Sequence, residues 1–176
     1  MNKELKYILL AVLIAASFIS GFYVHCFFFS PSIIISPYYG DEILDFINSA
    51  EESLDVEVYL ISSTEVIDAL GTAKDRGVSV RVIVDAGVYE DGNDWVLERL
   101  AENGIPVKFG SEHKRYHSKF IIKDGEAVIV GSHNLSYSAL YQNREVSILL
   151  YNILVEEFKQ LFEEDWNKGI YPEMVL

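Results

Sequence analysis

The feature that most constrains this chain is a long uncharged segment near its N-terminus. From Tyr7 to Phe29 the sequence contains no Asp, Glu, Lys or Arg. As a helix this run rises about 34 Å, which is enough to cross a hydrocarbon core of roughly 30 Å. No charged residue interrupts it to make the solvent-facing side of an amphipathic helix. We therefore expect residues 7–29 to form one N-terminal transmembrane helix.

The charges that flank this run predict its orientation. Lys3 and Lys6 precede it, and no acidic or basic residue follows it before Asp41. This asymmetry favours a cytoplasmic N-terminus and an extracytoplasmic remainder. A cleaved signal peptide, which would make the protein secreted, is the alternative, because the side chains at 15–17 are small enough for a peptidase. The apolar run continues well past these small side chains. This length favours the interpretation of residues 1–29 as an uncleaved membrane anchor.

The remaining chain, residues 30–176, has the size and composition of one folded domain. Half of the 176 residues are apolar and 23% are charged, which supports a hydrophobic core and excludes a disordered chain. The formal net charge of -13 argues against binding a polyanion over the whole surface. Cys26 is the single cysteine, so an intrachain disulfide framework and a cysteine-rich zinc site are excluded.

Helical and strand patterns alternate along this domain. Apolar residues recur at helical spacing in the ranges 43–50, 66–73, 95–101 and 154–166. Short β-branched or alternating patterns typical of strands occupy 33–35, 56–60, 78–84, 105–109 and 145–150. Two more strands, 119–123 and 126–130, flank Asp124-Gly125, a strong hairpin signal. We therefore expect an α/β fold in which helices cover both faces of a mixed β-sheet.

The residues that indicate a catalytic function lie in one stretch, residues 117–145. They form the pattern H-x-K-x4-D-x6-G-S-x-N, followed by N-x-E. Its members are His117, Lys119, Asp124, Gly131, Ser132, Asn134, Asn143 and Glu145. The first three positions alone arise by chance in about one such chain in a hundred, and the rest lower that frequency by several orders of magnitude. The pattern therefore predicts a catalytic site.

These residue types suit attack on a phosphodiester. His117 can act as a nucleophile or as a general acid and base near neutral pH. Lys119 follows two residues later on the same strand, so it shares a face with His117 and brings positive charge to a phosphate. Glu145, on a neighbouring strand, can hold the imidazole of His117 in one tautomer.

Three further residues complete the predicted site. Ser132 ends a strand after a glycine, where its hydroxyl and a backbone N–H can approach phosphate oxygens. Asn134 adds a neutral hydrogen-bond donor for charge on those oxygens. Asp124 also begins the hairpin turn, so a catalytic role and a structural role are both open.

At these residues the chain resembles the phospholipase D superfamily, whose HKD signature corresponds to His117, Lys119 and Asp124. The resemblance covers roughly residues 33–166. It is closest to the single-motif branch of Nuc-type endonucleases and mitochondrial phospholipase-D-like nucleases. It implies the phospholipase D/nuclease fold for residues 30–176, a covalent phosphohistidine intermediate, and no metal or other cofactor. This chain lacks the cysteines of the zinc-binding insertion that the mitochondrial branch often carries.

The resemblance also implies a homodimer with its active site at the two-fold interface, because single-motif members bring two motifs together across that axis. One His117 would attack phosphorus while His117 of the partner subunit protonates the leaving oxygen. Water would then release the intermediate. The two histidines would titrate as a coupled pair, one neutral and one charged.

The motif does not choose between a nucleic acid and a phospholipid. Local charge favours a nucleic acid, because the bases of residues 108–123 outnumber the single acid, Glu112. These bases are Lys108, Lys114, Arg115, Lys119 and Lys123. We expect a membrane-anchored, metal-independent endonuclease whose substrate contacts include Lys114, Arg115, Lys119, Ser132 and Asn134. The alternatives are a phospholipase acting on the bilayer and an inactive membrane-tethered nucleic-acid-binding module.

Overall fold

The chain divides into two units, residues 1–31 and residues 32–176. The computed structural model describes residues 3–28, 30–89, 94–111 and 113–172, with side chains described for 7–21 of the first helix. That helix, α1 (Lys3–Phe28), makes up most of the first unit. The predicted transmembrane helix is not confirmed: within the described part of the chain, no helix is both long and apolar enough to cross a membrane.

The second unit is built on one mixed sheet of seven strands in the order β1-β7-β6-β5-β2-β3-β4. The strands are β1 (Ser32–Ile35), β2 (Ser53–Val58), β3 (Ser79–Val84), β4 (Val107–Phe109), β5 (Lys119–Lys123), β6 (Ala127–Gly131) and β7 (Val146–Tyr151). β2, β3 and β4 pair in parallel, and the other neighbours pair antiparallel. The predicted α/β class and mixed sheet are confirmed.

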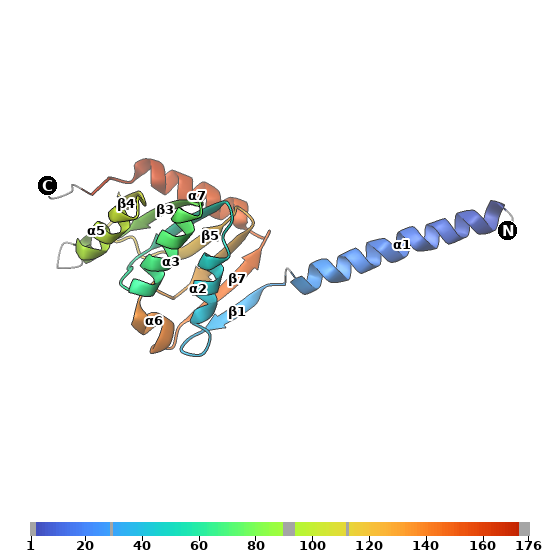
Figure 1. Ribbon diagram of the computed structural model, residues 1–176, viewed down its shortest axis with the longest axis horizontal. Helices are drawn as coiled ribbons and strands as arrows, with labels where there is room; N and C mark the ends of the chain where they lie inside the picture. The colour runs from blue at the N-terminus through green and yellow to red at the C-terminus, as the bar shows by residue number, and fades with distance from the viewer. Residues whose placement is uncertain (1–2, 29, 90–93, 112, 173–176) are drawn as a thin grey trace. The chain divides into compact units, whose positions relative to one another are not determined.

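Helices cover both faces of this sheet, as expected (Figure 1). α2 (Asp41–Asn48), α3 (Thr64–Asp75) and α5 (Asp94–Glu102) bury their apolar sides in a core that includes Val56 and Val82. α7 (Val155–Lys168) packs on the opposite face, where Phe162 meets Ile83 and Phe120 in a second core. The central strands are therefore buried on both sides, and burial of apolar area on both faces is the main driving force for this arrangement.

Two short helices were not predicted, α4 (Ala86–Tyr89) and α6 (Tyr137–Tyr141). Each is too short to produce a helical hydrophobic period. The start of α6 does carry a local signal, since the Ser136 hydroxyl accepts a hydrogen bond from the Ala139 N–H at 3.2 Å. Such a serine cap is typical of a helix start.

The turn between β5 and β6 is tied to the chain that enters β2. Asp124 and Gly125 both adopt positive φ, at 54° and 65°. The Asp124 carboxylate accepts hydrogen bonds from the backbone N–H groups of Glu51, Glu52 and Ser53, the last two at 2.7 and 2.9 Å. Burial alone would raise the pKa of Asp124, but these three donors outweigh it and lower that pKa. The aspartate thus joins the hairpin to β2.

We expect Asp124→Ala to lower the free energy of unfolding by about 1–2 kcal/mol at pH 7, because three backbone donors lose a charged acceptor that is partly screened by solvent. A group whose pKa is lowered by folding stabilises the folded state above its ordinary value of 3.8 and loses that effect as the pH falls. The difference from the wild type should therefore vanish in strong acid. Urea unfolding at several pH values measures it.

Glu126→Ala is the matched control, because Glu126 is exposed in the same hairpin. A loss for Asp124→Ala no larger than that of the control, or a loss that persists unchanged in acid, contradicts this role of Asp124.

Candidate active site

The predicted catalytic residues gather at one edge of the sheet because β5 runs antiparallel to both of its neighbours. His117 and Ser118 directly precede β5. The start of β5 lies beside the end of β2, where Val58 pairs with Lys119, and beside the end of β6, where Val130 pairs with Phe120. β7 begins next to the end of β6, so the residues that precede it arrive at the same edge.

The imidazole of His117 is exposed at this edge and in contact with Lys119. The Lys119 ammonium lies 3.2 Å from His117 Nδ1 and donates to the His117 carbonyl oxygen at 2.7 Å. The ring of Tyr59 flanks both, with its centroid 4.6 Å from that of His117 and 5.3 Å from Lys119 Nζ. His117 and Lys119 therefore form a preassembled pair with one aromatic wall.

The contact with Lys119 fixes the tautomer of the neutral imidazole. An ammonium group only donates, so Nδ1 of His117 accepts, and the proton of the neutral ring lies on Nε2. Partial burial lowers the pKa of Lys119, and the negative charge of Glu145 acts in the opposite direction. Glu145 thus lies close enough to Lys119 for its charge to affect the pKa of the lysine.

Glu145 is held by Ser132 and Asn143 rather than by His117. The Ser132 hydroxyl donates a short hydrogen bond to Glu145 Oε2, and the Asn143 amide donates to Oε1 at 3.3 Å. Ser132 Oγ also accepts from the Val146 N–H at 3.0 Å. Among the interactions described for Glu145, none is with His117, so a triad-like contact is not formed within one chain.

Gly131 places Ser132 by letting two strands approach closely. A Cβ atom at Gly131 would collide with the Ser147 side chain and with the backbone of Val146 and Ser147. Only glycine fits where β6 passes this close to β7. In the Gly-Ser pair of the motif, Gly131 therefore allows β6 and β7 to pack closely, and Ser132 supplies a hydroxyl at the edge of the sheet where His117 lies.

His133 supports the site from below. It is buried, and its two ring nitrogens contact the hydroxyls of Ser147 at 2.7 Å and Ser36 at 3.0 Å. Ser36 Oγ also donates to the carbonyl oxygens of Ala139 and Asn143. Burial lowers the pKa of His133, opposed by the charge of Glu145, which favours a neutral ring. This network ties the end of β1 to the segment that carries Asn134 and Glu145.

The structure brings together His117, Lys119, Ser132 and Glu145, with Asn134 on the same loop. Asn134 is half-buried, and its amide oxygen has no hydrogen-bond partner in the described part of the chain. Asp124 is not part of this group: it lies past the other end of β5, roughly 20 Å along the strand from His117. Of its two open roles, the geometry supports the structural one.

The basic residues of 108–123 divide in the same way. Lys114 and Arg115 are exposed close to His117 in sequence. Lys108 donates to the Trp166 carbonyl oxygen at 2.7 Å, and Lys123 donates to Ser49 Oγ at 2.9 Å, both away from the site. Glu112 lies outside the described residues. Fewer basic residues therefore lie at the site than the sequence of 108–123 indicated.

Sequence reasoning missed Tyr59, Ser36 and Ser147. Tyr59 directly follows β2, and its ring forms a wall of the site only because β2 pairs with β5. Ser36 and Ser147 are far apart in sequence and meet at His133. The predicted strands 56–60 and 145–150 contain Tyr59 and Ser147, but no local pattern indicates which strands become neighbours.

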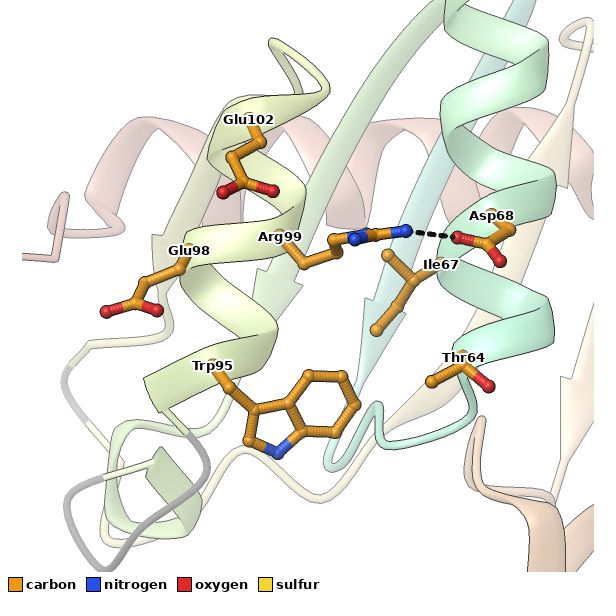
Figure 2. A pocket seen from close by; sticks show the side chains of 7 residues that line it. All are labelled: Thr64, Ile67, Asp68, Trp95, Glu98, Arg99 and Glu102. Atoms are coloured by element: carbon orange, nitrogen blue, oxygen red, sulfur yellow. Dashed lines mark hydrogen bonds and ion pairs between the residues drawn. The ribbon is translucent and has the colours of Figure 1, made fainter.

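A separate cavity of about 460 Å³ lies between α3 and α5 (Figure 2). An ion pair between Arg99 and Asp68 crosses it, and Trp95 lies at one end. Glu98 and Glu102 also line it, so carboxylates outnumber cations there and disfavour a phosphate anion. None of the catalytic candidates lines this cavity. In the part of the chain that is described, no cluster of three or more His, Cys, Asp or Glu side chains is arranged to hold a metal ion.

Comparison with known proteins agrees with this geometry. The family model "Cardiolipin synthase, PLD-like domain" matches residues 43–166. The mitochondrial cardiolipin hydrolase of Chlamydomonas reinhardtii is 31% identical over 126 residues, which cover 70% of this chain and 56% of that protein. A phospholipase D of Rickettsia prowazekii is 34% identical over 108 residues, covering 61% and 52%. This chain thus spans about half the length of the curated relatives it matches.

Among solved structures, Nuc from Salmonella typhimurium, described as a phospholipase D family member, has a TM-score of 0.76 at 28% identity. The match covers 81% of this chain and 97% of that structure. The family match, the shared fold and the motif residues at one sheet edge lead to one conclusion: the chain belongs to the phospholipase D-like family.

Proposed function

We propose that this protein hydrolyses a phosphodiester bond through a covalent intermediate on His117. The observation that carries the proposal is the exposed His117–Lys119 pair at a sheet edge that also holds Ser132, Asn134 and Glu145. Lys119 supplies a positive charge for a phosphate, and the amide nitrogen of Asn134, on the segment that follows β6, can donate to phosphate oxygens. These are the groups that a nucleophilic attack on phosphorus requires.

The tautomer of the free site sets the first step. With Lys119 donating to Nδ1, Nε2 of His117 carries the proton and serves as a proton donor. Binding of a phosphate draws the ammonium of Lys119 toward its oxygens and frees Nδ1 to take the proton. Nε2 then attacks phosphorus, a bond forms between Nε2 and phosphorus, and the bond to the leaving oxygen breaks. Water later attacks phosphorus and gives a proton to the group that protonated the leaving oxygen, while the bond between phosphorus and Nε2 breaks and releases His117.

The leaving oxygen needs a proton from a second group, which we assign to His117 of the partner subunit. Of the histidines with described side chains, His133 is buried with both ring nitrogens in contact with serine hydroxyls, and His113 is exposed on a loop. The ring of His113 lies against that of Tyr116, with centroids 5.6 Å apart, and no described contact joins either histidine to His117. A homodimer that joins two copies of the edge across a two-fold axis supplies the missing group.

A nucleic acid is the substrate that local charge supports best. Lys114 and Arg115 are exposed and close to His117 in sequence, whereas the chain as a whole has a net charge of -13. A confined basic strip attracts a polyanion backbone to one place only. A second candidate is an anionic phospholipid, favoured by the relatives named cardiolipin hydrolase and phospholipase D.

Replacing the nucleophile should abolish turnover whatever the natural substrate is. We expect His117→Ala to lower kcat on bis-p-nitrophenyl phosphate, a chromogenic phosphodiester, by about a thousandfold or more. An acid-sensitive p-nitrophenyl phosphoryl group attached to His117 should be trapped from the wild type during turnover and found by peptide mass. His113→Ala is the matched control and should keep wild-type activity. Substantial turnover by His117→Ala rules out the mechanism.

A substrate panel separates the two candidates. The wild type is assayed in the presence of a chelator with single-stranded DNA, RNA, and vesicles that contain cardiolipin. We expect nucleic-acid cleavage that falls steeply with added salt, because phosphate contacts release counterions. The double variant Lys114→Ala/Arg115→Ala should reduce the salt slope by about two.

Lys74→Ala/Lys159→Ala removes the same charge from the helices and is the control. Hydrolysis of vesicle lipid without nucleic-acid cleavage would overturn the nuclease assignment in favour of the phospholipid. A salt slope that is equal in both double variants would remove Lys114 and Arg115 from the binding site.

A further inference from the structure

A buried glutamate, Glu57, lies on β2, next to the start of β5. Glu57 is the last residue but one of β2, pairs with Phe120 of β5, and points to the face covered by α7. It is 1% exposed, and in the described part of the chain neither of its carboxylate oxygens has a hydrogen-bond partner at bonding geometry. An ionised carboxylate without partners in such a place is strongly unfavourable. The structure therefore requires a neutral Glu57 or a nearby compensating group.

The polar groups that approach Glu57 belong to the segment before β5 and to α7. They are the hydroxyl of Ser118, adjacent to His117, and the carboxylate of Asp165. Asp165 in turn accepts a hydrogen bond from the Tyr116 hydroxyl at 2.6 Å. A neutral Glu57 can donate its proton to Asp165, whereas two ionised carboxylates offer only acceptors to each other. The acid pair thus faces both neighbours of His117.

The same segment is held from a second side. The backbone N–H of Tyr116 donates to Asp85 at 2.6 Å, and the Tyr59 N–H donates to the Ser118 carbonyl oxygen at 3.0 Å. These bonds fix the main chain on either side of His117. The side chains of Tyr116 and Ser118 then meet the acid pair beneath them.

The cations on this face are already engaged elsewhere. Arg81 bonds Asp55 at 2.7 Å and Glu163 at 2.6 Å, and Lys108 donates to the Trp166 carbonyl oxygen. The titratable or charged groups that surround Glu57 from β2, β3, β4, the segment before β5, and α7 are Asp55, Arg81, Asp85, Lys108, Tyr116, Glu163 and Asp165. The acids of this set outnumber its cations, so a proton is the available means of neutralising Glu57.

We propose that Glu57 and Asp165 share a single proton, and that this shared proton fixes residues 116–118, and with them the ring of His117, against α7. Glu57 is then a positioning residue that acts through Ser118, not a group that touches the substrate. Loss of the proton leaves a charge on the buried Glu57 beside the half-buried carboxylate of Asp165, and their repulsion loosens the segment that carries His117. The effect on activity rests on the proposed function; the shared proton itself does not.

The pKa of Glu57 sets the pH range in which the shared proton is lost. Burial first, opposed by the Ser118 hydroxyl and reinforced by the charge of Asp165, raises the pKa of Glu57 from 4.5 to about 7. A carboxyl whose pKa is raised by folding contributes stability that is complete below 4.5 and is lost as the pH rises through about 7. The free energy of unfolding therefore falls as the pH rises from 4.5 toward 7.

The test compares the wild type with Glu57→Gln, whose amide is a permanent neutral donor to Asp165. We expect its Tm to exceed that of the wild type by several degrees at pH 8, with a difference that closes toward pH 5. With a phosphodiester substrate, the ratio of kcat for Glu57→Gln to kcat for the wild type should rise about tenfold between pH 6 and pH 8. Glu98→Gln, which removes one exposed carboxylate, is the control and should show neither change.

Two signals can be measured without an active enzyme. A carboxyl ¹³C titration of the wild type should contain one glutamate that titrates near pH 7, and the backbone amide resonances of residues 116–118 should inflect at the same pH. Those amide inflections should be absent from Glu57→Gln. All glutamates titrating below pH 5.5, or amide inflections that are unchanged in Glu57→Gln, overturn the proposal, whereas an inactive wild type with both signals present contradicts only the proposed function.

Discussion

Strand β5 lies between β2 and β6 and runs antiparallel to both, so its first residues meet the last residues of its neighbours. Pairing of Val58 with Lys119 and of Val130 with Phe120 fixes that register. A shift by one residue would turn His117 and Lys119 toward the α7 core and turn Phe120 out of it. The apolar residues of β5, packed on both faces, therefore determine where the His117–Lys119 pair is held.

Much of this arrangement follows from local sequence patterns. The helical spacing of 154–166 and the Asp124-Gly125 turn led to α7 and to the hairpin of β5 and β6. The alternation of His117 with Lys119 placed both on one face, and the structure brings them into contact. What local patterns do not contain is the partner of each strand. Tyr59, Ser36 and Ser147 became part of the site only through such pairings.

Asp124 and Glu57 illustrate two different limits of the pattern. The HKD spacing groups Asp124 with His117, but an extended strand separates residues by about 3.3 Å each, so seven positions carry the aspartate to the opposite end. Glu57 stands among alternating apolar residues, a pattern typical of a strand with one wet face. The face is dry because α7, almost a hundred residues later in sequence, covers it. Neither fact is encoded near the residue concerned.

The two ends of the sheet differ in what they leave open. At one end β4 has three residues, and Phe109 exchanges two backbone hydrogen bonds with Ile170 beyond α7, so that border is closed. At the other end β1 has four residues and, among the described residues, pairs only with β7. An incoming strand thus finds a border of a few peptide groups, too short to nucleate the long ladders of fibrous aggregates. For a chain with so much β-branched sequence, brevity of the outer strands is a form of solubility control.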